Sequence, residues 1–145
     1  MFIRGRRLRQ NENIRNLVEE TSISVNDLIM PIFLMDGKNK SEKIDSMPGI
    51  FRKTLDEQLK DIDSAINLGI NALIIFPSIN EKLKDSLGKE ALNKKGLVPK
   101  AISIIKKKFP RILVITDVAL DPYNSDGHDG VLKDGEILND KTVEI

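Results

Sequence analysis

The sequence predicts an α/β protein in which parallel strands alternate with helices. Three apolar runs, at residues 28–35, 72–76 and 112–116, are typical of buried strands, and an amphipathic helical pattern separates each from the next. Such helices are long enough to cover a face of a parallel sheet. Four acids and the single histidine follow the third run, between residues 117 and 130. Because α/β proteins carry their chemistry at the carboxyl ends of strands, this segment is the candidate site.

The composition is that of one globular domain and excludes several classes of partner. The 145 residues are 40% hydrophobic, and 23 basic against 22 acidic residues leave a net charge of +1. No overall field therefore attracts nucleic acid or an anionic membrane. There is no cysteine, which excludes disulfides and thiolate metal sites. No membrane span, signal peptide or glycine-rich phosphate loop is recognisable, so we expect a cytoplasmic protein without nucleic-acid or membrane partners.

Residues 1–27 predict an arm outside the main body. The segment is polar and carries four arginines among its first nine residues, followed by a short helical pattern at Ile14, Leu17 and Val18. That pattern is too small to bury much by itself. A solvated basic tail and an arm that docks on another subunit both remain open. Nucleic-acid contact is disfavoured, because no aromatic residues alternate with the arginines to stack on bases.

The first strand and the segment after it contain turn signals. In the apolar run 28–35, Pro31 indicates an edge position or a bulge, since proline cannot donate to a neighbouring strand. Residues 41–53 turn at Met-Pro-Gly, 47–49, which predicts a small hairpin. Thr54 and Glu57 then have the spacing of a capping box.

Two helices and the strand between them follow. Leu55, Leu59, Ile62 and Ile66 share one helical face, and Gly69 can end that helix. Pro77 is expected to close the strand 72–76, and residues 78–96 to form a long loop. The second helix covers residues 97–109, with Pro99 in its first turn and Pro110 after its end.

The last segment predicts a hairpin beside the site. Residues 130–138 place Asp134 and Gly135 between short apolar flanks, and this pair favours a tight hairpin turn. Such a hairpin could act as a lid. Asn139 is expected to cap a further helix, with Asp140 near its positive end.

Several motifs occur in order along the chain. They are Arg-Arg-Leu-Arg at 6–9, Leu-Val-Glu-Glu-Thr at 17–21, Asp-Leu-Ile-Met-Pro-Ile-Phe at 27–33, Ser-Met-Pro-Gly at 46–49, Phe-Pro at 76–77, Asp-Val-Ala-Leu-Asp-Pro-Tyr at 117–123, Gly-His-Asp-Gly at 127–130 and Asp-Gly-Glu-Ile-Leu-Asn-Asp at 134–140. Together these motifs resemble the porphobilinogen synthase family, also called δ-aminolevulinic acid dehydratase. The likeness covers all 145 residues but only the amino-terminal half of that enzyme.

The resemblance implies the amino-terminal part of a TIM (β/α)8 barrel preceded by an extended arm. Residues 1–27 would be the arm, and residues 28–145 an incomplete barrel of three βα units with the acid-rich loop and hairpin, cut short in the next helix. It also implies a homo-octamer built through the arms. The implied activity is that of a hydro-lyase that joins two molecules of 5-aminolevulinate to porphobilinogen, with loss of two waters, in haem biosynthesis.

In the family, two lysines form Schiff bases with the substrate ketones. Both belong to later strands, and the lysines here, such as Lys82, Lys84, Lys94 and Lys95, match neither. The 145-residue chain is therefore expected to be a truncated, inactive piece of the enzyme.

The resemblance also implies roles for individual residues of the acid-rich loop. Asp117 matches the family's active-site aspartate, which would orient the substrate amine or move a proton. Zinc-dependent members carry cysteines where this chain has Ala119, Asp121 and Asp129, so Asp121 and Asp129 are the candidate ligands of magnesium or a monovalent cation. His128, Tyr123 and Ser125 are expected in a lid or around the site rather than on the metal.

Other interpretations of these acids stay open. Asp117 can cap a turn or helix, and Asp121 and Asp129 can be ordinary loop acids, since aspartate before proline or glycine is common in turns. Asp126 departs from the histidine usual in the family. A non-catalytic remnant that binds a cation or another subunit is the alternative function. A receiver-like domain with Asp117 on magnesium fits the alternation but explains neither the arm nor the loop.

Overall fold

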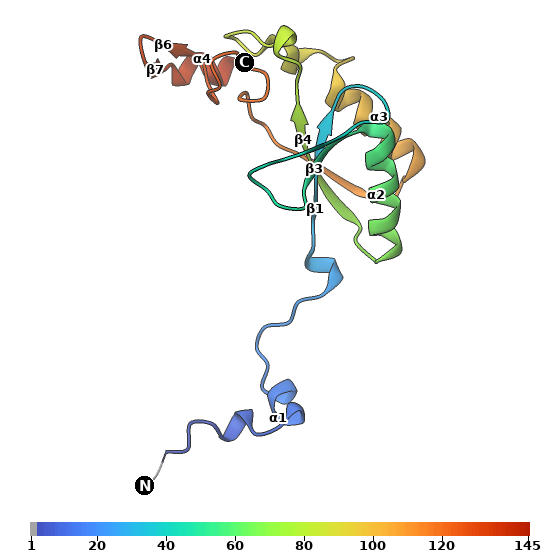
Figure 1. The fold of residues 1–145 in the computed structure, drawn as a ribbon. Coiled ribbons are helices and arrows are strands. Elements are labelled where there is room, and N and C mark those ends of the chain that lie inside the picture. Colours follow the sequence, from blue (N-terminus) through green and yellow to red (C-terminus); the bar gives the residue numbers. More distant parts are fainter. Residues whose placement is uncertain (1–2) are drawn as a thin grey trace.

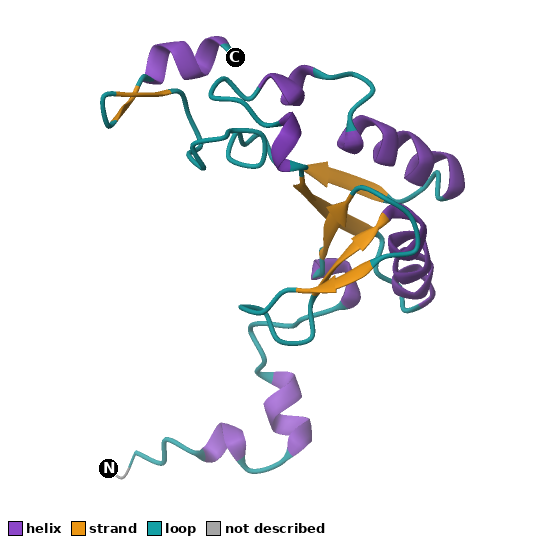
Figure 2. Cartoon of the chain, turned by 45° about the horizontal axis from the view of Figure 1, so that its top comes forward, coloured by secondary structure: helices purple, strands orange, loops and turns teal. Residues whose placement is uncertain are grey.

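The computed structural model describes residues 3–145, and its centre is a five-stranded sheet with two helices on one face (Figures 1 and 2). The sheet order is β2-β3-β1-β4-β5, parallel except for β2. This confirms an α/β fold with a mostly parallel sheet. The elements are α1 Glu12–Leu17, β1 Met30–Met35, β2 Ser41–Lys43, β3 Phe51–Thr54, α2 Leu55–Asn67, β4 Ala72–Ser78, α3 Leu97–Lys108, β5 Leu113–Thr116, the hairpin β6 Leu132–Lys133 and β7 Glu136–Ile137, and α4 Asn139–Glu144.

The hydrophobic core lies between the sheet and the two helices. Alternate residues of each strand point to the same face, so that Ile32 of β1 and Ile75 of β4 pair in register under the helices. Ile62 of α2 and Ile105 of α3 are fully buried against them. The amphipathic patterns predicted from the sequence therefore form the core as expected.

Within residues 3–145, no helix covers the opposite face of the sheet (Figure 1). Phe33 and Phe76 lie in register on β1 and β4, and their rings stack with centroids 5.5 Å apart. Figure 1 shows both α2 and α3 on the other side of the strands. We call this surface the open face.

The prediction of a third buried strand is wrong for this chain. β5 pairs with β4 alone and forms one edge of the sheet. Its first residue, Leu113, is 59% exposed. An apolar strand at a free edge offers its backbone groups to another strand.

Pro31 and Pro77 both lie at positions that one of the two neighbouring strands does not reach. β1 is an internal strand, so the predicted edge position of Pro31 is wrong. However, β3 pairs only with Phe33–Met35, so Pro31 has a partner on the β4 side alone. Pro77 does not close its strand, because β4 continues to Ser78 beyond the reach of β5. Each proline therefore has a paired strand on one side only, a position in which a missing N–H is tolerated.

Two predicted caps are wrong, although their helices form. Thr54 is buried, and its hydroxyl exchanges hydrogen bonds with the backbone of Lys40 instead of capping α2. Asn139 is the first residue of α4 rather than its cap. The turn signals hold: Gly69 follows α2 with φ +92°, and Asp134 and Gly135 both have positive φ in the β6–β7 hairpin.

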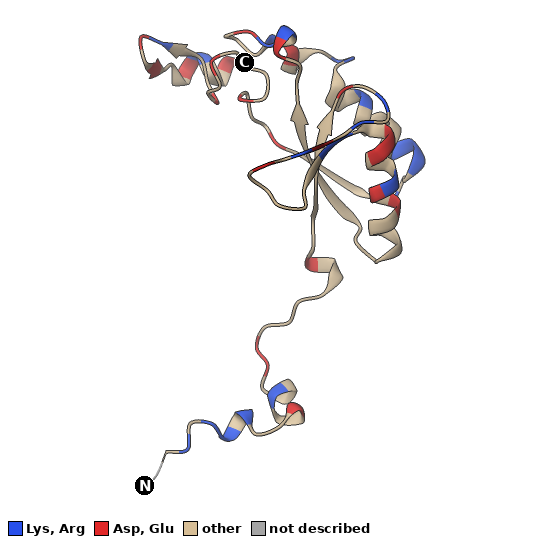
Figure 3. Cartoon of the chain, in the orientation of Figure 1, with Lys and Arg blue, Asp and Glu red and all other residues tan. Residues whose placement is uncertain are grey.

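Residues 3–29 lead away from the sheet, with α1 far from the core (Figure 1). Figure 3 shows basic positions along the segment before α1. Leu17 is 85% exposed. Met1 and Phe2, the first residues of the predicted arm, lie outside the described part of the chain. Within residues 3–145, no helix has the length and apolar character needed to cross a bilayer.

Candidate functional site

The acid-rich loop begins where β5 ends, and it brings three of the predicted residues to one pocket. Asp117 is the first residue after β5, and its side chain is exposed. With Asp121 and Tyr123 it lines a pocket of about 260 Å³, whose opposite wall includes Ile75 and Phe76 of β4. The pocket therefore lies at the carboxyl ends of two parallel strands.

The other three predicted residues do not line this pocket. The carboxylate of Asp129 accepts a hydrogen bond from the backbone N–H of Leu120, which closes the loop on itself. Ser125 and His128 are exposed. Asp129 thus stabilises a turn within the loop. An ordinary loop acid was one of the two interpretations that the sequence left open, and a metal ligand was the other.

The loop by itself does not fit a metal ion. Among residues 3–145, no three histidine, cysteine, aspartate or glutamate side chains are grouped as metal ligands would be. Asp121 and Asp129 therefore have no third partner of this kind in the described part of the chain. Their role as metal ligands stays a prediction.

Sequence reasoning missed the residue that holds the loop together, Asn124. Its side chain is only 2% exposed. Its Nδ2 donates to the carbonyl of Gly130 at 2.9 Å, and its Oδ1 accepts from the N–H of Asp126 at 2.6 Å. A buried amide whose donor and acceptor are both used fixes the loop geometry. A lone asparagine in a turn-rich segment gives no periodic signal in the sequence.

A second loop is tied to this one through Asp85. The N–H of Asp85 donates to the carbonyl of Tyr123 at 3.3 Å, and the carbonyl of Asp85 accepts from Ser125 at 3.0 Å. The N–H of Leu87 donates to the Asp85 carboxylate at 2.8 Å and holds its pKa below the ordinary value. Gly88 packs so close that a Cβ there would lie 3.3 Å from Leu120. The two loops therefore form one unit above the sheet.

Tyr123 is a partly buried residue of the pocket. Burial raises the pKa of its hydroxyl, and the nearby charge of Glu90 acts in the same direction. Both effects favour the protonated phenol, whose hydroxyl is able to donate a hydrogen bond.

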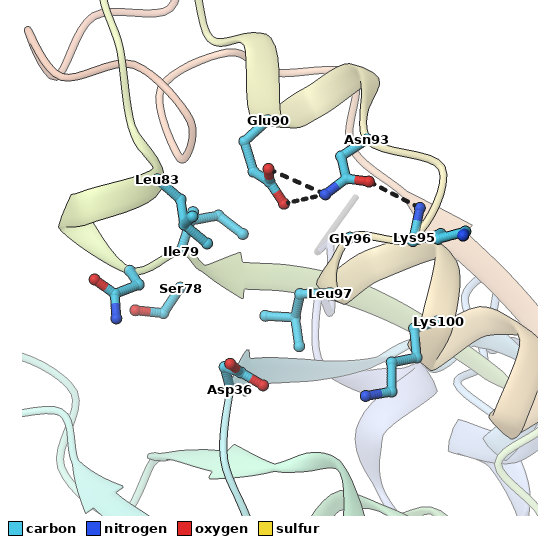
Figure 4. Close-up of a pocket in the computed structure, with 11 residues that line it drawn as sticks. Asp36, Ser78, Ile79, Leu83, Glu90, Asn93, Lys95, Gly96, Leu97 and Lys100 are labelled. Carbon is cyan, nitrogen blue, oxygen red and sulfur yellow. Dashed lines mark hydrogen bonds between the residues drawn. The ribbon is translucent and has the colours of Figure 1, made fainter.

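A separate pocket of about 250 Å³ lies where β1 and β4 end and α3 begins (Figure 4). There the amide of Asn93 donates to both carboxylate oxygens of Glu90, at 3.0 and 3.2 Å, and accepts from the N–H of Lys95. None of the predicted site residues lines it. It is therefore distinct from the candidate site.

Replacing Asn124 with alanine is expected to lower the free energy of unfolding by about 1–3 kcal/mol, because two buried hydrogen bonds are lost. Urea denaturation followed by circular dichroism measures this. Ser125→Ala, at an exposed neighbour, is the matched control and should change the stability by less than about 0.5 kcal/mol. Equal effects of the two substitutions would contradict the structural role of Asn124.

Together the fold and the loop define an α/β protein with its candidate site at the carboxyl ends of parallel strands. The family model described as delta-aminolevulinic acid dehydratase matches residues 2–145. The chain belongs to the delta-aminolevulinic acid dehydratase family, which confirms the resemblance seen in its motifs.

Individual relatives agree with this assignment. A delta-aminolevulinic acid dehydratase of Bradyrhizobium diazoefficiens is 47% identical over 145 residues, which are 100% of this chain and 41% of the relative. One from Chlamydia pneumoniae is 44% identical, with 98% of this chain and 43% of the relative covered. A crystal structure of the Toxoplasma gondii ME49 enzyme with its reaction product porphobilinogen superposes with a TM-score of 0.94 at 42% identity, covering 99% of this chain and 41% of that one. The chain spans about two fifths of the length of these relatives.

Proposed function

We propose that the chain supplies the amino-terminal part of a porphobilinogen synthase, which condenses two molecules of 5-aminolevulinate to porphobilinogen with loss of two waters. The observation that carries the proposal is the TM-score of 0.94 over 99% of the chain with an enzyme whose crystal contains porphobilinogen. In this proposal residues 1–27 are the arm and residues 28–145 the first part of a TIM barrel. Placement of both helices on one face supports this, because a barrel keeps its helices outside and its open face inside.

Within this function, Asp117 is the proposed catalytic residue of the chain. Its exposed carboxylate, in the pocket at the end of β5, can orient a substrate amine or move a proton. Tyr123, which stays protonated, is the proposed hydrogen-bond donor beside it. The lysines of the chain match neither Schiff-base position of the family, so we propose that the 145 residues alone are inactive.

We propose magnesium or a monovalent cation as the metal of the whole enzyme. Oxygen ligands such as Asp121 suit hard cations, and the chain has no thiolate for zinc. Because the loop offers no group of three ligands in residues 3–145, further ligands or waters must complete the site. Magnesium generally keeps several waters when it binds proteins.

Binding of Mg²⁺ to the isolated chain is expected to be weak, with a Kd on the order of 10⁻³ M or higher, because few ligands are assembled. Isothermal titration calorimetry of the purified chain measures it, with Asp121→Asn as the comparison. Zinc retained in stoichiometric amount through dialysis would contradict the assignment of the loop.

The proposed partner is a second copy of the chain, held through the arm within a homo-octamer. The exposed apolar residues of the arm, among them Leu17 and Ile23, support docking on a subunit better than a solvated tail. A cytoplasmic location, without nucleic-acid or membrane partners, is part of the same proposal.

A chimera tests the proposed function. The chain is joined at residue 145 to the remaining carboxyl-terminal sequence of the Bradyrhizobium diazoefficiens relative, which is 47% identical over the shared part. We expect the chimera to form porphobilinogen from 5-aminolevulinate in a pyrrole colour assay, and the isolated chain to give no more than a boiled control. A folded, oligomeric chimera without activity would favour the non-catalytic alternative.

A further inference from the structure

An apolar cleft lies between α2 and α3, on the helix side of the sheet, and is separate from the pocket of Asp117. Its volume is about 300 Å³. None of the residues proposed for the catalytic site lines it. We call it the interhelix cleft. Its apolar lining comes from both helices and the end of β1, and consists of Met35, Leu55, Leu59, Leu97 and Ile104.

The two helices carry more apolar surface than the sheet covers. Ile105 of α3 is fully buried in the core, whereas its neighbour Ile104 is 37% exposed. Leu97 lies two turns before Ile104 on the same side of α3, and Leu55 and Leu59 lie one turn apart on α2. These side chains form a second apolar row beside the core, and this row lines the interhelix cleft.

The loop after β1 forms a third wall of the cleft and is held in place. Lys38 of this loop lines the cleft. The next two residues are tied to the start of α2, because the N–H of Asn39 donates to the carboxylate of Asp56 at 2.9 Å. The N–H of Lys40 donates to the hydroxyl of Thr54 at 3.1 Å. A site whose walls are already fixed loses little entropy when a ligand binds.

The charged groups of the cleft leave one positive charge in excess. Lys38 and Lys100 line it, and neither takes part in a salt bridge within residues 3–145. Asp56 also lines it, but this acid lies in the first turn of α2, where the positive end of the helix dipole and the N–H of Asn39 balance its charge. Asp36 is then the single carboxylate left for two ammonium groups. A ligand with one negative charge complements this set.

The cleft adjoins the polar pocket of Figure 4. The two share Asp36, Leu97 and Lys100. On the far side of this boundary the lining is polar and includes Glu90 and Asn93. A molecule that lies in the cleft therefore has apolar surroundings along the helices and a polar, solvated end beside Lys100.

The dimensions of the cleft fit a small molecule better than a protein segment. Small-molecule pockets have volumes of roughly 300–1,000 Å³, whereas specific protein interfaces bury roughly 1,200–2,000 Å². From Leu97 to Ile104 the helix rises by about 10 Å, close to the extended length of an octyl chain. In the proposed barrel, later helices would flank the outer sides of α2 and α3 and would not enter the cleft between them.

We propose that the interhelix cleft binds a medium-chain carboxylate, with its alkyl chain between Leu59 and Ile104 and its carboxylate held by Lys38 and Lys100. Burial of the chain supplies most of the affinity, and the two lysines select the charge. This site goes beyond the proposed function and does not depend on it.

Equilibrium dialysis of the 145-residue chain with radiolabelled octanoate tests the site. We expect a Kd of about 10⁻⁴–10⁻³ M, as is reasonable for a ligand of this size. Unlabelled butyrate should displace the label only at concentrations at least about tenfold higher than octanoate, because it buries fewer methylenes. Octylammonium keeps the chain but reverses the charge, so it should compete poorly.

Substitutions locate the bound label. Lys38→Gln and Lys100→Gln are each expected to raise the Kd by about threefold or more, since each removes a charged hydrogen-bond donor at a partly solvated position. Lys107→Gln, at an exposed lysine of α3 outside the cleft, is the matched control and should leave the Kd unchanged. Ile104→Gln should raise the Kd by about fivefold or more. Its control is Leu92→Gln, at a leucine that is 65% exposed outside the cleft.

Three results would overturn the proposal. The first is a chain of unchanged circular dichroism that retains no label at about 10 mM octanoate. The second is octylammonium competing as well as octanoate. The third is equal binding by Ile104→Gln and Leu92→Gln, which would place the label on another surface, such as the open face. If no label binds and Ile104→Gln lowers the mass found by light scattering, the occupant of the cleft is a second copy of the chain instead.

Discussion

Replacing Asp117 with alanine is expected to lower the kcat of the chimera by a factor of about 100 or more, because a positioned acid or base contributes roughly 10²–10⁴ to a rate. His128→Ala should reduce kcat by less than about fivefold. Asp117 lies in the pocket at the end of β5, whereas His128 is exposed and does not line it. The pyrrole assay at saturating 5-aminolevulinate measures both.

Asp117→Asn serves as the control for this experiment, since it keeps the size of the side chain and removes only its charge. It should be nearly as inactive as the alanine variant. Full activity of either Asp117 variant, or a larger loss on His128→Ala, would show that the loop residues are assigned wrongly.

The isolated chain is expected to self-associate at micromolar concentration. The open face exposes apolar surface around Phe33 and Phe76, and β5 leaves a free strand edge. Such surfaces promote pairing between chains. Light scattering coupled to size-exclusion chromatography should therefore find species larger than a monomer.

Substitutions can locate the surface responsible for self-association. Leu113→Lys places a charge on the exposed edge strand and should shift the population toward monomer. Leu68→Lys, at a leucine just after α2 that is 73% exposed, is the matched control and should have little effect. A monodisperse monomer of the unsubstituted chain with cooperative unfolding would argue against an unfinished barrel.

The local parts of the fold could be predicted because their signals lie close together in the sequence. The periodic positions of α2 and α3 have only one face to bury, and the Asp134–Gly135 turn has a backbone preference of its own. The predictions that failed concern residues whose structural partners are distant in the sequence. The hydroxyl of Thr54 bonds to Lys40, fourteen residues away, and Pro31 and Pro77 are tolerated because neighbouring strands are staggered.

At the candidate site, too, features with a local sequence signal could be predicted, and those that depend on distant partners could not. The position of Asp117 at a strand end followed from the apolar run before it, and the structure places it beside Asp121 and Tyr123 in a pocket. The grouping of Arg52 and Lys84 at one pocket of the open face could not be predicted, because strand register and a loop bring these residues together. Asn124 was missed for a similar reason, since its importance lies in its burial.

The one-sided placement of α2 and α3 has a consequence for the synthesis of the protein. α3 connects the neighbouring parallel strands β4 and β5, and α2 connects β3 with β4, which lie on either side of β1. The core residues from Ile32 to Ile105 therefore meet partners within one continuous stretch of the chain. Local connections of this kind lower the entropic cost of closing loops and favour rapid folding. Because domains begin to fold as they leave the ribosome, the core is expected to begin to assemble before the acid-rich loop has emerged from the ribosome. The acid-rich loop would then dock onto a sheet that is already formed.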